Sequence, residues 1–195
     1  LGALGREFVV IPTLISDPAL PNLKKQYDRL RILSVNDNTK ISIKNNAGVT
    51  FDTTLNKGKV YELDFNSASY INSINPIIVC LFTSTMTYKS SGNKYGDLVM
   101  IWVNPIEQNL TDIIFTALPT TRVQKHYVNI VTKSVDHAST LLDGVSIASK
   151  CIEMAANKDY TYAIVEIANL NVPHQIVNPS GFSAYVYGYC YVQRL

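Results

Sequence analysis

Short apolar runs and alternating segments, each closed by turn residues, follow one another along the chain. In residues 27–35, Leu30 and Ile32 fall on one side and Arg31 on the other, which is the two-residue period of a β-strand. Asp143-Gly144 is a strong signal for a tight hairpin. Strands are predicted at 8–11, 27–35, 41–43, 49–55, 60–65, 77–86, 98–103, 113–118, 127–132, 145–147, 160–167 and 182–192.

The same order of signals is written twice. Phe8-Val9-Val10-Ile11-Pro12-Thr13 is matched by Phe115-Thr116-Ala117-Leu118-Pro119-Thr120, and Asn75-Pro76 precedes a long apolar run as Asn178-Pro179 does. We therefore expect an internal duplication with residues 95–109 as its seam. Phe8 and Phe115 should lie in equivalent strands, and residues 8–88 should superpose on 115–193.

These signals predict an all-β fold of two tandem antiparallel β-sandwich repeats. The first repeat with its connecting strand is assigned to residues 1–109 and the second to 110–195. Closure of both units into one larger sandwich is the alternative. Residues 141–157 contain fair helix formers, but the run is short, so strand or turn is favoured there.

Composition narrows the classes of function. The chain has 195 residues, of which 47% are apolar and 12 are tyrosines, so it suits a globular β-rich fold. Its net charge of +2 is too small to indicate a nucleic-acid partner. No apolar run reaches the length of about 18 residues that marks a membrane span.

Candidate catalytic groups lack partner motifs. His126, His137 and His174 have no neighbouring nucleophile or metal-binding motif, and we expect them on the surface or in turns. A glycosidase needs two carboxylates in one cleft. The candidates for such a pair are Asp97, Glu107, Asp136 and Glu166, which are otherwise expected to be solvated.

Metal sites are not indicated. Asn36-Asp37-Asn38 offers oxygen ligands for calcium, but an Asx-type turn is the favoured interpretation. No Cys/His cluster has the spacing of a zinc site. The sequence therefore assigns no catalytic residue, no metal ligand and no cofactor, and the binding residues stay unknown.

Four tyrosines alternate near the C-terminus, at positions 185, 187, 189 and 191. On a strand they share one face. That face is either an aromatic platform for a glycan or protein, or one side of a sandwich with hydroxyls at its rim. The second interpretation is favoured, because the side chains on the opposite face would be too small to fill a core.

The three cysteines allow one disulfide. Cys80 lies in an apolar run and is expected to be buried and reduced, which leaves Cys151–Cys190 as the candidate bridge. A bridge closing that loop would contribute about 3–4 kcal/mol and would indicate an oxidising compartment. Asn109-Leu110-Thr111 is the single N-glycosylation sequon, so Asn109 is the glycosylation candidate.

Several segments follow one another in a characteristic order: Gly5 with 6–10, 31–39, Asn75-Pro76 with 77–79, 96–100, 105–108, Leu142-Asp143-Gly144 and 184–189. Taken in this order, they resemble the N-terminal domain of IgG-Fc-binding protein. The resemblance covers nearly the whole chain and rests on the spacing of weak motifs. It implies a secreted or surface interaction module, often beside von Willebrand D-type or other extracellular domains.

Three functions are compatible with these observations. The first is a non-enzymatic extracellular or cell-surface adhesion module that binds a protein or glycoprotein partner. The second is a carbohydrate-binding domain of jelly-roll type, and the third is a hydrolase. Glycan binding in an aromatic or acidic cleft would favour the second, and a deep pocket with two carboxylates of separated pKa the third.

Overall fold

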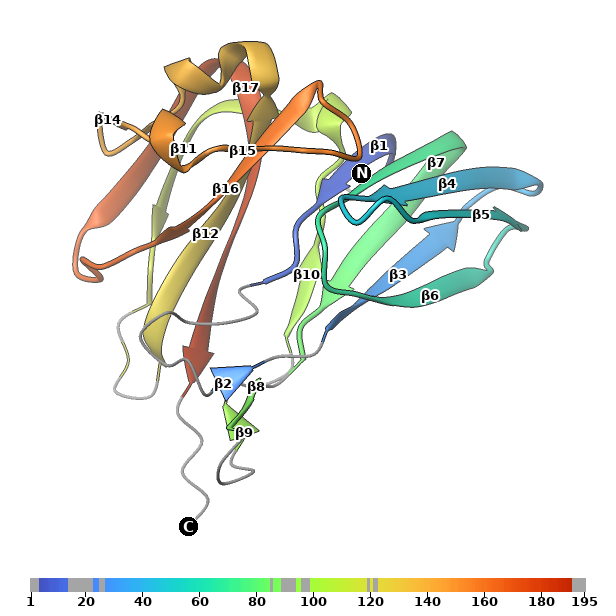
Figure 1. Cartoon of the computed structure of the whole chain (residues 1–195), viewed down its shortest axis with the longest axis horizontal. Coiled ribbons are helices and arrows are strands. Elements are labelled where there is room, and N and C mark those ends of the chain that lie inside the picture. Colours follow the sequence, from blue (N-terminus) through green and yellow to red (C-terminus); the bar gives the residue numbers. More distant parts are fainter. Residues whose placement is uncertain are drawn as a thin grey trace.

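A computed structural model of the chain describes residues 4–13, 23–24, 27–84, 86–88, 94–95, 99–118, 120 and 123–190. Two large antiparallel sheets curl side by side, the blue and green one from the first half of the chain and the yellow to red one from the second (Figure 1). The predicted all-β class is confirmed, with two β-sandwich-like repeats. Within the described ranges, no helix is long and apolar enough to cross a membrane.

The first sheet is organised around the long strand β7. β1, β3, β4 and β10 all pair with β7, while β5 extends the sheet from β4 and β6 extends it from β3. The strands are β1 (Leu4–Val10), β3 (Asp28–Ser34), β4 (Thr39–Asn45), β5 (Thr50–Leu55), β6 (Val60–Phe65), β7 (Ser69–Phe82) and β10 (Met100–Trp102).

The second sheet repeats this plan around β17. It contains β11 (Leu110–Thr116), β12 (Val123–Lys133), β13 (Leu141–Leu142), β14 (Val145–Ser146), β15 (Ile152–Glu153), β16 (Tyr160–Glu166) and β17 (Pro173–Cys190). A small third sheet joins β2 (Leu23–Lys24), β8 (Met86–Tyr88) and β9 (Lys94–Tyr95). Three 3-10 helices, η1 (Ile106–Gln108), η2 (Ser134–Ser139) and η3 (Ala148–Lys150), lie in connections.

Both long strands have the same kink. The pairing of β1 with β7 jumps from Ile77 to Asn72, and the pairing of β11 with β17 jumps from Phe182 to Val177. The skipped residues, 73–76 and 178–181, hold the two Asn-Pro pairs, since proline cannot donate to a regular ladder. Each long strand can therefore pair with one set of strands before its kink and another set after it.

The register corrects one detail of the predicted duplication. Phe8 and Phe115 do lie in equivalent strands, β1 and β11. However, Phe8 pairs with Ile71, and the residue at that place in the second repeat is Ile113, which pairs with Ile176. The match of the two Phe-to-Pro-Thr motifs is thus two residues out of step with the structural equivalence, because the kink sets the register.

Buried residues form three clusters. One lies inside each repeat, around Leu30 and Ile32 in the first and Val128 and Ile130 in the second. A third cluster joins the repeats, and its fully or nearly buried members are Val9, Ile11, Ala68, Val131, Met154 and Tyr160. The two repeats are therefore held together by an apolar interface of their own.

Two further expectations can be compared with the structure. Residues 141–157 form short strands and η3, so the preference for strand or turn over an α-helix is confirmed. β7 begins at Ser69, well before the predicted start at residue 77, because Ser69, Ile71 and Ser73 alternate into the interior. The polar residues between them face outward, which hid the strand in the sequence.

Candidate functional site

The outward side of the first sheet carries the most distinctive exposed surface among the described residues. Across β10, β7, β3 and β6, Trp102, Cys80, Arg31 and Glu62 lie opposite one another in one row. The next row runs through Met100, Phe82, Arg29 and Asp64, and a third contains Ile78, Leu33 and Val60. We call these eleven residues the front face of the first repeat.

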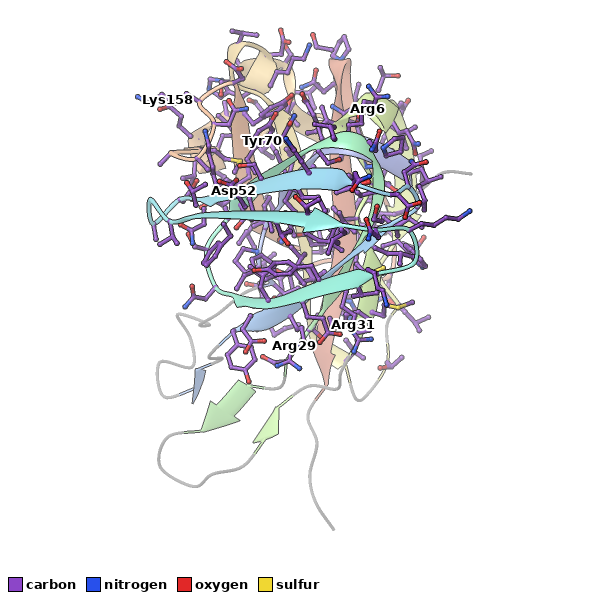
Figure 2. The ribbon with its side chains drawn as sticks, turned by 90° about the vertical axis from the view of Figure 1, so that its right-hand side faces the viewer. Arg6, Arg29, Arg31, Asp52, Tyr70 and Lys158 are labelled. Atoms are coloured by element: carbon purple, nitrogen blue, oxygen red, sulfur yellow. The ribbon has the colours of Figure 1, made fainter. Side chains whose placement is uncertain are left out.

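Charge and aromatic groups alternate on this face. Arg29 Nε lies 2.8 Å from Asp64 Oδ1, and this hydrogen bond raises the pKa of Arg29. Arg31 pairs with Glu62, and its guanidinium sits 4.7 Å above the centre of the Phe82 ring. Both arginines project from β3 (Figure 2). Since these ion pairs are solvent-exposed, they contribute little to stability.

Large apolar side chains remain open to solvent beside these charges. Trp102 is 51% exposed and Met100 and Val60 are each 50% exposed. Tryptophan, methionine, phenylalanine and arginine are the residues that protein interfaces favour, and tryptophan and arginine often dominate binding energy. The front face of the first repeat therefore has the composition of a protein-binding surface.

The equivalent face of the second repeat is covered instead. By register, Asn129 takes the place of Arg31, Tyr185 of Cys80 and Ile164 of Glu62. The front face of the second repeat consists of Tyr127, Asn129, Val131, Tyr162, Ile164, Glu166, Ser183, Tyr185 and Tyr187.

The end of β1 and the residues after it lie on this second front face. The Tyr185 hydroxyl donates to the carbonyl of Ile11 and accepts from the Ile11 N–H at 3.1 Å. Asn129 Nδ2 lies 3.3 Å from the carbonyl oxygen of Pro12, and Asn129 Oδ1 accepts from the Tyr187 hydroxyl at 3.1 Å. These groups are withdrawn from water, and burial raises the pKa of Tyr185.

Contacts at the other end of the interface reinforce it. Tyr70 of the first repeat stacks on Tyr160 of the second, with 6.1 Å between ring centres. Burial and the nearby Glu7 carboxylate raise the pKa of Tyr160 to about 12. The Ala156 N–H donates to Asn46 Oδ1 at 3.0 Å. The interface thus joins apolar burial to directed hydrogen bonds.

The described part of the tyrosine row therefore lies on the side of β17 that meets the first repeat. Tyr185 packs against the first repeat and Tyr187 lies on the same side of β17, while Ala184 and Val186 point into the core of the second repeat. The side chain of Tyr189, and Tyr191 as a whole, lie outside what the structure describes. For the two described tyrosines, the sandwich-face interpretation was closer than an open platform, but their hydroxyls are not at a rim: Tyr185 bonds to the buried backbone of Ile11, and Tyr187 bonds to the Asn129 side chain.

Two of the three histidines, His126 and His174, do not lie where they were expected. His126 and His174 are only 4% and 5% exposed, so a surface position is wrong for both. His126 packs beside Gly188, where a Cβ would come within 3.2 Å of the ring, and its Nε2 is buried without a hydrogen-bond partner in the described region. His137 does lie in a turn-like element, η2, and its Nδ1 is 2.6 Å from the Ser134 carbonyl oxygen.

His174 is part of a charged pair. Its Nδ1 lies 2.7 Å from Asp143 Oδ2, and its Nε2 faces the Asn169 carbonyl. Burial alone would lower the pKa of His174, but these two hydrogen bonds and the Asp143 charge together raise it. With an acceptor at each ring nitrogen, the doubly protonated imidazolium is favoured.

The three candidate carboxylates that the structure describes do not lie together in one cleft. Glu107 accepts the Arg6 N–H at 2.7 Å, Glu166 pairs with Lys125, and Asp136 lies in η2. Asp97 lies outside the described residues. No group of three or more His, Cys, Asp or Glu within the described part of the chain could hold a metal ion. Asp37 accepts the Lys57 N–H at 3.0 Å, as a turn residue does.

The predicted disulfide is not formed. Cys151 is a free thiol that donates to the Ile147 carbonyl, and burial raises its pKa. Next to it, Ile152 pairs with Tyr162, which pairs with Val131, whereas the backbone of Cys190 pairs with Val123. The strand between Val123 and Val131 spans about 25 Å, far beyond the Cα separation of about 7 Å that a bridge tolerates.

The two remaining residue predictions concern Cys80 and Asn109. Cys80 is a free thiol as expected, but it is half-buried on the front face, and burial raises its pKa. Asn109 follows η1 and is half-buried, with its Oδ1 enclosed and lacking a hydrogen-bond partner among the described residues. Its glycosylation stays a prediction.

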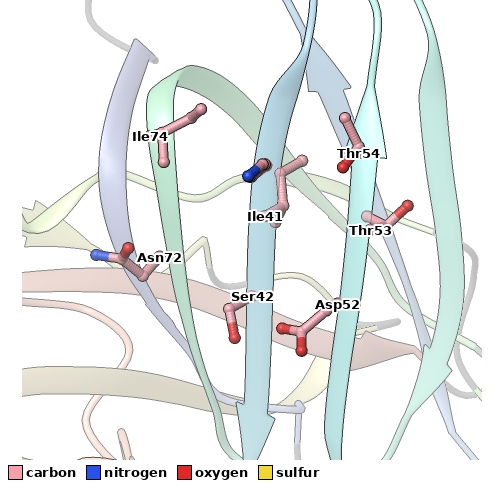
Figure 3. A pocket seen from close by; sticks show the side chains of 8 residues that line it. Ile41, Ser42, Asp52, Thr53, Thr54, Asn72 and Ile74 are labelled. Atoms are coloured by element: carbon pink, nitrogen blue, oxygen red, sulfur yellow. The ribbon is translucent and has the colours of Figure 1, made fainter.

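A second surface feature is a shallow groove on β4, β5 and β7, of about 440 Å³. Ser42 and Asp52 face one another across β4 and β5, with Asn72 and Ile74 on the neighbouring strand β7 (Figure 3). Its lining residues carry hydroxyl, amide and charged groups, but most of the lining surface is apolar, and none of them has an aromatic ring.

Comparison with known proteins decides the family. The family model described as IgGFc binding protein matches residues 1–188. The chain belongs to this family. No curated protein and no solved structure matches it. The family is one of protein-binding modules that are typically extracellular, and it is not an enzyme family.

Proposed function

We propose that the chain is a non-enzymatic extracellular adhesion module that binds a protein or glycoprotein partner through the front face of the first repeat. The observation that carries this proposal is the exposure of Trp102 and Met100 beside Arg31, on a face whose counterpart in the second repeat is covered. Membership of a binding-module family supports it.

The proposal predicts that partner capture depends on the front face. The immobilised chain is incubated with extracellular fluid of its source, and retained proteins are identified by mass spectrometry. Trp102→Ala should weaken capture at least about 30-fold, the loss typical of an interface hot spot. Val135→Ala is the matched control, because Val135 is 87% exposed in η2 and outside the front face.

The Fc part of immunoglobulin G is the first purified ligand to test, because the family description names it. Titration of Fc against the wild-type chain and Trp102→Ala separates binding at the front face from binding elsewhere. Equal Fc affinity of the two chains would place Fc binding outside the front face. Capture of extracellular proteins that is unaffected by Trp102→Ala would overturn the proposed site.

Glycan binding is the alternative function, and the shallow groove on β4, β5 and β7 favours it. Asp52 and Asn72 offer the carboxylate and amide groups that hydrogen-bond to sugar hydroxyls. The groove lacks an aromatic ring for stacking, so we place protein binding first. Glycan-array signals that disappear in Asp52→Ala and persist in Trp102→Ala would support the alternative.

The extracellular location of this chain and its modification are part of the same proposal. Expression through a secretory pathway, followed by enzymatic removal of N-glycans, tests Asn109 directly. A mass shift in the wild type that is missing in Asn109→Gln supports the sequon. An unshifted mass would show that the half-buried Asn109 is not modified.

A further inference from the structure

The contact between the repeats joins two different faces. The second repeat contributes its front face, with Asn129, Val131 and Tyr185. The first repeat contributes the opposite kind of surface, the outward side of β1 and of the first half of β7. Val9, Ile11, Ala68 and Tyr70 form this surface, which we call the back face of the first repeat.

Such a front-to-back contact leaves one face unused at each end of the pair. The front face of the first repeat is open, as described above. Register identifies the back face of the second repeat: Ile114 stands where Val9 stands, Thr116 where Ile11 stands, and Gln175 where Tyr70 stands. Val9 is 1% exposed, whereas its counterpart Ile114 is 71% exposed.

A second large apolar residue is exposed near Ile114, although Thr116 and Gln175 on this face are polar. Leu118, which follows β11 as Thr13 follows β1, is also 71% exposed. Isolated exposed side chains need no explanation. Here, however, Ile114 repeats the position at which Val9 meets the second repeat, Leu118 is exposed four residues further on, and Trp102 and Met100 are exposed on the front face of the first repeat.

We propose that the front face of the first repeat binds the back face of the second repeat in another copy of this chain. Because the contact is heterologous and does not close on itself, molecules join head to tail into open chains. This inference rests on the proposed function, since it names a partner for the same face.

The chemistry of the open faces fits this joint. Within one molecule, Asn129 donates to the main-chain carbonyls of Ile11 and Pro12. Between molecules, Arg31 takes the position of Asn129, and the carbonyls of Thr116 and Ala117 take the positions of Ile11 and Pro12. A guanidinium has donors to spare for such carbonyls after pairing with Glu62.

A complementation experiment tests the joint. Trp102→Glu places a charge on the open front face, and Ile114→Glu places one on the open back face. Both side chains are more than half exposed, so both variants should retain the fold, which circular dichroism checks. Val135→Glu, at an 87% exposed position outside both faces, is the control.

Sedimentation equilibrium over a concentration series gives the readout. The wild type and Val135→Glu should reach masses above the dimer, while each face variant alone associates at least about 30-fold more weakly. A mixture of the two variants should form a dimer and stop there, because each variant keeps the face that the other has lost.

Two results would overturn the inference. One is a wild-type chain that stays monomeric at about 1 mM, a concentration at which even weak specific contacts are populated. The other is a mixture of the two variants that does not recover the dimer, which would indicate a symmetric contact. If self-association fails while Trp102→Ala still loses a captured partner, the inference falls and the proposed function stands.

Discussion

The front faces of the two repeats occupy the same place in the fold and differ in what covers them. On the first repeat, Arg31 pairs with Glu62 in solvent. At the matching positions on the second repeat, Asn129 and Ile164 lie beneath the first repeat. Topology is therefore shared, and the side chains at equivalent positions record whether the sheet face meets water or protein.

The covered face shows why its residues differ from those of the open face: they must be buried at a low desolvation cost. An arginine–glutamate pair buried between the repeats would have to lose its hydration, which its Coulombic attraction often does not offset. A neutral amide and tyrosine hydroxyls can instead satisfy backbone groups at lower desolvation cost. Asn129 and Tyr185 do this for the residues that follow β1. The repeats thus kept their strand pairing while their outward residues diverged.

The largest expected effect comes from exchanging equivalent positions on the two faces. Asn129→Leu should lower the free energy of unfolding by about 3 kcal/mol, because it leaves buried carbonyl and hydroxyl groups without a partner. Arg31→Leu, at the matching exposed position, should change it by no more than about 0.5 kcal/mol. Urea unfolding of both variants measures the contrast, and similar losses for the two would refute it.

A smaller change of the same kind removes one hydroxyl. Tyr185→Phe keeps the ring in place but deletes the hydrogen bonds to Ile11 and Asn129. We expect a loss of about 1–2 kcal/mol in urea unfolding. Combined with Asn129→Leu, it should cost less than the sum of the single losses, since both act on one network. Strict additivity would mean that the two side chains do not cooperate.

The sequence predicted the strands well because alternation is a local property. Leu30, Arg31 and Ile32 reveal their two faces without reference to the rest of the chain. The twofold order of strands and hairpins was also visible. The division at residues 109 and 110 stays a prediction, and the apolar cluster shared by the repeats shows that they form one packed unit.

What covers an outward face could not be predicted from the same pattern. Tyr185 bonds to Ile11, which lies 174 positions away in the sequence, so local periodicity carries no sign of the contact. The burial of His174 likewise depends on Asp143 from another strand connection. Trp102 stood out in the sequence only as the single tryptophan, and its place on an exposed face follows from the pairing of β10 with β7.

The absence of the predicted Cys151–Cys190 bridge from the second repeat can be tested in the same way. If Cys151 forms no disulfide, Cys151→Ser should change the free energy of unfolding by less than about 1 kcal/mol. The change should be the same with and without a reducing agent. A Cys151–Cys190 bridge would instead contribute about 3–4 kcal/mol under oxidising conditions only. Urea unfolding with and without dithiothreitol distinguishes the two cases.

The smallest expected effect belongs to a charged pair present in the second repeat. Burial alone would raise the pKa of Asp143, but hydrogen bonds from His174 and the Gln175 N–H hold it below its ordinary value, while the pKa of His174 is raised. The stability from His174 is present below its unfolded pKa of about 6.5 and is lost as pH rises through the higher folded value. The stability from Asp143 is present above about pH 4 and is lost as pH falls through the lower folded value.

The pair should therefore stabilise the fold most between about pH 4 and 6.5. Because Asp143 is partly exposed, we expect only a few tenths of a kcal/mol, as for other solvated ion pairs. His174→Gln also changes packing, so the measurement is how its stability difference from wild type shifts between pH 5.5 and pH 8.5. That difference should shrink at the higher pH, and Asp143→Asn should show the same trend, because either substitution removes the same pair. A difference that grows with pH would mean that the neutral imidazole is the form bound in the native state.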